Sequence, residues 1–167
     1  MLVSNNIIKN NYQEAGRKQK FFLSFVFSKE PMIKPIIKDQ QLLAKKATPT
    51  TKADLPLAND LSDTLNAHQA ECVGIAANMI GVNKNAIIAR IGPFNVVMFN
   101  PQIVAKSHPY QTAEGCLSLS GTRPTKRYKQ ITVNFRNQSW QMQTLELTDF
   151  AAEIVQHEID HCNGIII

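Results

Sequence analysis

Residues 156–161, Gln-His-Glu-Ile-Asp-His, constrain this chain more than any other stretch of its sequence. Side chains four positions apart on an α-helix lie on the same face, with Cβ atoms about 5–6 Å apart. His157 and His161 have this spacing, so both imidazoles can reach one metal ion while Glu158 stands beside it. The His-Glu-x-x-His pattern is typical of helices that bind zinc and use the glutamate as a general base. The alternative is a helix whose histidines are ordinary surface or core residues.

The residues around this motif favour a helix. Thr148 or Asp149 can cap its N-terminus, and Gly164 can end its last turn in a left-handed conformation. One apolar stripe at helical spacing is expected to face the core, and the metal motif falls on the stripe beside it. The core stripe contains Ala151, Val155, Ile159 and Cys162, the second stripe contains Ile154, His157, Glu158 and His161, and the polar side contains mainly Glu153, Gln156, Asp160 and Asn163.

The composition excludes several classes of protein. A chain of 167 residues that is 44% apolar can form one domain with a core. Its longest apolar run is far shorter than the roughly 20 residues of a membrane-spanning helix, so we expect no membrane partner. Three cysteines at scattered positions argue against a disulfide framework and favour a reducing, cytoplasmic location.

The net charge of +5 is concentrated near the N-terminus. Residues 1–31 carry five basic and two acidic side chains, whereas residues 32–167 carry 13 basic and 11 acidic ones. Because the second segment has no dense basic stripe with interleaved aromatic residues, we expect no specific nucleic-acid partner. Its one basic cluster, residues 126–129, is interpreted as a solvated strand end.

Residues 1–31 also differ from the rest of the chain in composition, since they are rich in Asn, Lys and Gln and show no clear periodicity. We interpret them as an N-terminal extension that is poorly ordered or that results from an upstream start. In the second case Met32 is the true start.

The remainder predicts a mixture of helix and antiparallel strands. A helix is expected over residues 53–69, with its leucines facing the core. Residues 92–93, Gly-Pro, are expected to form the turn of a hairpin, and residues 100–101, Asn-Pro, to end a strand. We therefore predict an α+β fold in which antiparallel β-sheets pack around the C-terminal helix that carries the metal motif. The strand-like runs are residues 86–91, 94–99, 102–106, 131–135 and 140–147.

Two histidines leave the metal site incomplete, because an open catalytic site needs three protein ligands. Only six residues follow His161, so the third ligand must lie upstream. Cys116 follows Gly115, which permits close backbone approach, and a thiolate there could bind strongly. The candidates are Cys72, Cys116, His68, His108 and several carboxylates.

At Cys116 the sequence resembles the peptide deformylase family. The three motifs of that family occur in order, at residues 72–81 (CVGIAANMIG), 114–118 (EGCLS) and 156–161 (QHEIDH). The resemblance implies that residues 32–167 form a catalytic domain of this kind. It implies a metal-dependent hydrolase that removes the N-formyl group from the N-terminal methionine of newly made polypeptides, with the ribosome as a transient contact.

The resemblance also implies roles for individual residues. Cys116, His157 and His161 would bind one divalent metal ion, Fe(II) in the first instance, with Zn(II), Ni(II) or Co(II) as alternatives. Glu158 would act as general base and then as general acid, and the backbone N–H of Leu117 would donate to the oxyanion. An N-formyl-methionyl peptide would pair as a strand with the first two motifs. The substrate-binding residues implied are Val73, Gly74, Ile75 and Gly115, with Arg123 near the entrance.

The first motif departs from the family pattern at two positions. It normally opens with Gly and carries a Gln that helps to hold the oxyanion, where this chain has Cys72 and Met79. Methionine cannot donate that hydrogen bond, and the loss of one such donor costs about 10²–10³ in rate. Asn78 is adjacent and could substitute as the donor, although in an extended backbone a neighbouring side chain points to the other face.

Two other functions are compatible with these residues. A metalloamidase for another N-acyl substrate would keep the metal and accommodate Met79. A catalytically weak, peptide-binding paralogue would keep the fold without turnover.

Overall fold

The structure is a computed structural model that describes residues 30–167. Almost all of the predicted extension, residues 1–31, lies outside the described residues, as does the proposed upstream start. The helices are α1 (Gln40–Leu43), η1 (Lys52–Asp54, a 3-10 helix), α2 (Leu57–Ala67), η2 (Ala77–Ile80, also 3-10) and α3 (Asp149–Cys162). The strands are β1 (Gly74–Ala76), β2 (Ala86–Ile91), β3 (Phe94–Gly115), β4 (Thr122–Arg136) and β5 (Met142–Thr148).

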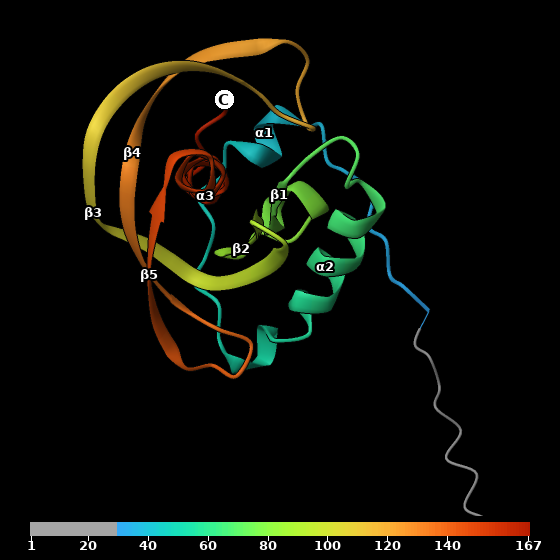
Figure 1. Cartoon of the computed structure of the whole chain (residues 1–167). Coiled ribbons are helices and arrows are strands. Elements are labelled where there is room, and N and C mark those ends of the chain that lie inside the picture. Colours follow the sequence, from blue (N-terminus) through green and yellow to red (C-terminus); the bar gives the residue numbers. More distant parts are fainter. Residues whose placement is uncertain (1–29) are drawn as a thin grey trace, which may run out of the picture.

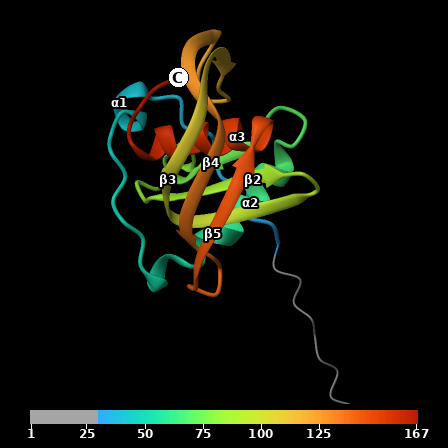
Figure 2. The ribbon, with the colours of Figure 1, turned by 60° about the vertical axis from the view of Figure 1, so that its left-hand side comes forward.

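The five strands form one sheet in the order β1-β2-β3-β4-β5, and each pairs antiparallel with the next. Figure 1 shows this sheet curved around α3, which is seen end-on, while α2 lies on the other side of β1 and β2. In Figure 2, α3 is seen from the side and crosses the long strands β3 and β4. The predicted α+β fold, with antiparallel strands around the C-terminal helix, is confirmed, and a single sheet takes the place of several.

The hairpin predicted at residues 92–93 is confirmed, since β2 and β3 flank that turn. The prediction that Asn100 and Pro101 end a strand is wrong, because β3 continues to Gly115. Asn100 has a φ of 50°, and the pairing of β3 with β4 shifts register around it. This bulge accommodates Pro101, which has no N–H for the ladder. The backbone of Thr50 holds the Asn100 side chain, donating to Oδ1 at 2.8 Å and accepting from Nδ2 at 3.0 Å.

The helix predicted over residues 53–69 is divided at Pro56. The 3-10 helix η1 ends at Asp54, and α2 begins at Leu57, directly after the proline. A proline has no N–H to donate, which is tolerated at a helix start but not inside a helix. The leucines of α2 are buried, as predicted.

Helix α3 begins directly after Thr148, and Gly164 has the left-handed φ of 75° that was expected after its last turn. The prediction that Gln156 lies on the polar side is wrong, because this residue is only 4% exposed. Its side-chain amide accepts from the N–H of Tyr128 at 3.0 Å and donates to the Tyr128 carbonyl at 2.9 Å. The sheet bends so far around α3 that β4 covers part of the side expected to face solvent.

The main core lies between α3, the sheet and α2. The large apolar side chains that are almost fully buried include Leu61, Leu65, Ile75, Ile87, Ile88, Met98, Phe99, Val133 and Val155.

No helix within residues 30–167 combines the length and the apolar character needed to cross a lipid bilayer.

Candidate metal centre

Three potential metal ligands from two parts of the chain converge. Cys116 directly follows β3, whereas His157 and His161 lie on successive turns of α3. Their ligand atoms all lie within 4.8 Å of one another. Nε2 of His161 is 3.2 Å from Sγ of Cys116 and 3.2 Å from Nε2 of His157. Around a tetrahedral ion with bonds of about 2.0–2.3 Å, ligand atoms are about 3.3–3.7 Å apart, so this donor set fits one divalent metal ion.

The other upstream candidates do not join this group; they include His68, His108 and Cys72. His68 is the C-cap of α2, and its Nδ1 pairs with Glu71 at 3.1 Å. His108 is exposed on β3. Among the described residues, Cys116 is the upstream residue that completes the group of three.

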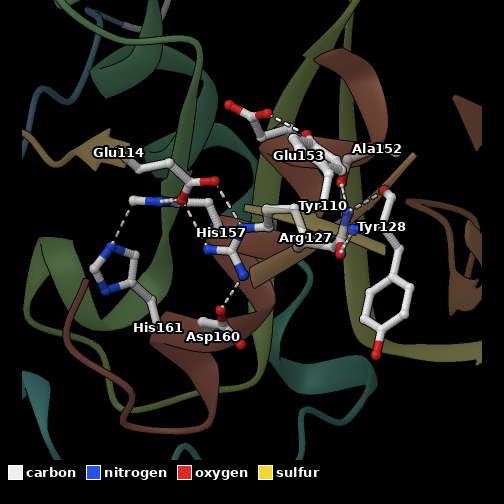
Figure 3. Close-up of polar contacts among 10 residues, drawn as sticks. Tyr110, Glu114, Arg127, Tyr128, Ala152, Glu153, His157, Asp160 and His161 are labelled. Atoms are coloured by element: carbon white, nitrogen blue, oxygen red, sulfur yellow. Dashed lines mark hydrogen bonds and ion pairs between the residues drawn. The ribbon is translucent and has the colours of Figure 1, made fainter. Parts of the chain in front are cut away.

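A buried ion-pair network orients His157 (Figure 3). Because the Glu114 carboxylate accepts from Nδ1 of His157 at 2.8 Å, Nε2 of that histidine is left to face the other ligands. Arg127 donates to both oxygens of Glu114, at 2.7 and 2.8 Å, and also to Asp160 on α3. Arg127 is only 3% exposed, so the interpretation of residues 126–129 as a solvated strand end is wrong at this position.

Sequence reasoning does not identify Arg127 or Asp160 as part of the site, although a partial signal for each exists. Arg127 has the same parity along β4 as Ile131 and Val133, and side chains of one parity share a face of the sheet. Asp160 lies one turn after His157 on α3. No local pattern shows that these two elements meet, because their contact depends on the curvature of the sheet.

This network controls the protonation of the histidines. Burial alone would raise the pKa of Glu114, but hydrogen bonds from His157 and Arg127, together with their charges, lower it to about 2. Burial and the charges of His157 and Arg127 lower the pKa of His161 to about 3, so its imidazole is neutral at pH 7 and has a lone pair for a metal. Burial lowers the pKa of His157, but hydrogen bonds to Cys116 and Glu114 raise it, with a net result of about 10. A cation that binds at Nε2 of His157 therefore displaces a proton.

Glu158 lies next to the ligands and is 4% exposed. Its Oε2 has no hydrogen-bond partner among the described residues. Burial raises the pKa of Glu158 to about 7, so the carboxyl group can both accept and release a proton near neutral pH. Gly74 on β1 leaves room for it, because a Cβ at that position would lie 2.5 Å from Oε1 of Glu158.

A pocket of about 570 Å³ borders Cys116 and His157. Its walls come from the end of β3, the segment that leads into β1 and the first turns of α3. The other predicted catalytic and substrate-binding residues that line it are Glu158, Leu117, Val73, Gly74 and Gly115.

Two of the predicted substrate-binding residues do not line this pocket. Ile75 is fully buried in the core. Arg123 lies across the β3–β4 ladder from Glu114, and its guanidinium donates to the Ser120 carbonyl at 3.4 Å. Neither side chain therefore lies in the pocket wall.

Two strand edges border the pocket. Within the described residues, β1 pairs with β2 along one edge only, and β3 from residue 102 onward pairs with β4 alone. The other edges of β1 at Gly74 and of β3 at Gly115 therefore have backbone groups that can pair with an added strand.

Met79 and Asn78 point in different directions. Met79 lines the pocket, and its Sδ accepts from the N–H of Ala76 at 3.4 Å. Asn78 is turned away and donates from Nδ2 to the carbonyl of His161 at 2.7 Å. The expectation that Asn78 points away is confirmed, although the reason differs, since η2 replaces the extended backbone that was assumed there.

Comparisons with known proteins agree on one family. A family model described as polypeptide deformylase matches residues 33–167. The peptide deformylase of Clostridium beijerinckii is 47% identical over 136 residues, which cover 81% of this chain and 100% of that protein. The peptide deformylase of Carboxydothermus hydrogenoformans is 35% identical, with coverages of 79% and 84%.

Solved structures lead to the same family. The Met-Ala-Ser-bound class I type b peptide deformylase of Acinetobacter baumannii has a TM-score of 0.73 and 30% identity, and the match covers 80% of this chain and 96% of that chain. The peptide deformylase of Thermotoga maritima has a TM-score of 0.73 and 29% identity, with coverages of 81% and 94%.

We expect Gly74→Ala to disturb Glu158, because the new Cβ would lie 2.5 Å from Oε1 and 2.9 Å from Cδ of that side chain. Gly115→Ala is the matched control, since its Cβ would have the Gly121 carbonyl oxygen at 3.6 Å as its nearest neighbour. In urea denaturation, Gly74→Ala should lower the free energy of unfolding by about 1–3 kcal/mol, and Gly115→Ala by less than about 0.5 kcal/mol. Equal stability of the two variants would show that Glu158 has room to move.

Arg127→Lys is expected to weaken the centre, because one ammonium group cannot keep both bonds to Glu114 and also reach Asp160. We expect a loss of about 1–3 kcal/mol in the free energy of unfolding and a metal affinity lower by about 10–100-fold in a chelator titration. Arg123→Lys is the control, since that guanidinium has only the 3.4 Å contact with Ser120. If both variants kept their metal equally well, the orienting role of Arg127 would be wrong.

Proposed function

The chain belongs to the polypeptide deformylase family, and from this membership we propose a role for each residue at the pocket. It is a hydrolase that removes the N-formyl group from nascent polypeptides. A different N-acyl substrate, or a peptide-binding role without turnover, is not favoured, because 47% identity to a peptide deformylase extends over 81% of the chain. The observation that carries the proposed roles is the convergence of Cys116, His157 and His161 beside Glu158. We assign the catalytic domain to residues 32–167.

We propose that Cys116, His157 and His161 hold one divalent metal ion. Such an ion would supply Lewis-acid activation of water and of the formyl carbonyl. One thiolate and two imidazoles suit several metals, so the donor types do not select among them. Fe(II) is our first candidate from the family resemblance, and Zn(II), Ni(II) and Co(II) are the alternatives.

Glu158 is the proposed general base and general acid. Its carboxylate takes a proton from the attacking water while the water oxygen forms a bond with the formyl carbon. It then gives this proton to the amine nitrogen as the C–N bond breaks, so that formate and a free N-terminal amine are the products. The buried position of Glu158 and its unpartnered Oε2 support this role.

Oxyanion stabilisation is assigned to the backbone N–H of Leu117, which lines the pocket. Met79 also lines the pocket, at the position where the family has a glutamine, but its thioether has no hydrogen to donate. Asn78 does not replace that donor, because its amide group is bonded to the His161 carbonyl. We therefore expect turnover to be slower than it would be with glutamine in place of Met79.

The substrate is proposed to be an N-formyl-methionyl peptide in extended conformation. It would lie between the two strand edges, with backbone contacts at residues 73–75 and at Gly115, and with Arg123 near the entrance. Binding of Met-Ala-Ser by the Acinetobacter baumannii relative supports a peptide in this pocket. Because formylated N-termini emerge from the ribosome, we also propose a transient ribosome contact and a cytoplasmic location.

Glu158→Gln should abolish the proton transfer while it keeps the size of the side chain. On formyl-Met-Ala-Ser, we expect kcat for formate release to fall by about 10²–10⁴, with the metal content per chain unchanged. Glu146→Gln, on β5 and outside the pocket, is the control and should leave kcat unaltered. Formate release by Glu158→Gln at the parent rate would refute the assigned base, and no formate from the metal-loaded parent would refute the proposed substrate.

Met79→Gln introduces a side-chain amide into the pocket at the position of the missing donor. We expect kcat on formyl-Met-Ala-Ser to rise, by up to about 10²-fold. Met79→Leu has a similar volume and no donor, and it should stay near the parent rate. A rate that is the same in the Gln and Leu variants would show that this position does not reach the oxyanion.

A further inference from the structure

The two histidines of the candidate metal centre are held in different ways (Figure 3). His157 donates from Nδ1 to the Glu114 carboxylate at 2.8 Å, which fixes the orientation of its ring. Nδ1 of His161 is buried and has no hydrogen-bond partner among residues 30–167. A metal-binding histidine is usually oriented by a partner at its other ring nitrogen. Since His161 has no such side-chain partner in the described structure, its position depends on the backbone of the helix turn that carries it.

That turn is the last one of α3, where a helix is least constrained by its own hydrogen bonds. α3 ends at Cys162, directly after His161. The last four carbonyls of a helix lack the partners of the regular helix pattern, and helix ends fray. The carbonyl of His161 accepts from Nδ2 of Asn78 at 2.7 Å, and the carbonyl of Cys162 accepts from the N–H of Ala47 at 2.8 Å. Segments far upstream in the sequence therefore hold this turn.

The orientation of the Asn78 amide is defined by its surroundings. Asn78 lies on η2 and is 5% exposed. Its Nδ2 faces two acceptors, the carbonyl of His161 and, at 3.4 Å, the carbonyl of Leu43. Its Oδ1 has no partner among the described residues, and a buried polar atom without a partner costs free energy. An apolar side chain of similar size would avoid that cost, so the contribution specific to asparagine is the hydrogen bond to α3.

We propose that Asn78 is a positioning residue for His161. Its amide holds the last turn of α3 against η2, so that Nε2 of His161 stays 3.2 Å from Sγ of Cys116. Met79 follows Asn78 on the same 3-10 turn and lines the pocket, so the same contact fixes that part of the pocket wall relative to the centre. The inference rests on the proposed function, because His161 is one of the metal ligands proposed there.

Such a contact must act in both directions. If η2 stabilises the metal-binding position of His161, then a metal bound by His161 stabilises η2 by the same free energy. Two backbone hydrogen bonds close the turn of η2: the N–H of Gly81 donates to the Asn78 carbonyl at 3.1 Å, and the N–H of Val82 donates to the Ala77 carbonyl at 2.9 Å. Hydrogen exchange of these two amides therefore reports whether metal binding reaches η2.

The test uses Co(II) with the full chain and measures three quantities: the affinity in a chelator competition, the absorption spectrum of the bound ion, and the exchange of the Gly81 and Val82 amides with and without metal. Asn78→Leu keeps a branched side chain of similar size that cannot donate. Asn78→Ser is too short to keep the 2.7 Å contact, and it gives the same comparison if the leucine variant does not fold. Ile80→Val is the control, because it removes one buried methylene from the same turn and no hydrogen bond to α3.

We expect both Asn78 variants to bind Co(II) about 10–100-fold more weakly than the parent protein. Their Co(II) spectrum should be altered, and metal binding should no longer slow exchange at Gly81 and Val82. Ile80→Val should unfold at a lower urea concentration but keep the parent affinity, spectrum and slowing of exchange.

Parent affinity and spectrum in the Asn78 variants would overturn this inference and leave the proposed function intact. An equal loss of affinity in Ile80→Val would also overturn it, because general destabilisation of η2 would then be the cause. If the parent protein itself bound no Co(II), the proposed metal site and this inference would both fail.

Discussion

The candidate metal centre depends on the buried contact between Arg127 and the two carboxylates that it joins. Glu114 comes from β3 and Asp160 from α3, so one guanidinium ties the sheet to the helix beside the histidines. Glu114 passes this constraint to His157 by accepting from its Nδ1. Removal of one partner from a buried ion pair costs about 3–5 kcal/mol, because the other charge is left uncompensated. The arrangement therefore orients the imidazole of His157 and also opposes separation of the sheet from α3.

The curvature of the sheet around α3 explains both the burial of the centre and the access to it. β4 follows the helix closely enough to bury Gln156 against the backbone of Tyr128. β1 and the far part of β3 each keep one edge without a partner among the described strands, and the pocket opens at these edges. A site on a helix is thus covered by strands on most sides and left open where an extended peptide could pair.

Much of the fold could be predicted from local patterns, and the errors occur where one element bends or meets another. The hairpin at residues 92–93 follows from its turn residues, and the end of α3 follows from Gly164. α3 begins directly after Thr148, although the side chain of Thr148 makes no capping hydrogen bond. Pro101 was expected to end a strand, but a bulge lets β3 continue past it. Arg127 and Gln156 were both expected to be solvated, and both are buried. Their polarity is satisfied by partners far away in the sequence, which no local pattern reveals.

The sequence by itself determined that His157, Glu158 and His161 lie together, because 3.6 residues per turn place these positions side by side on any helix. It also determined the fold class, since strand and helix periodicities are local properties. The residues left several upstream candidates for the third ligand, and the family resemblance implied Cys116. Only the tertiary structure decided that its Sγ lies 3.2 Å from Nε2 of His161 and that Arg127 lies behind the centre. Which distant segments meet depends on sheet register and curvature, and these are set by packing of the whole chain.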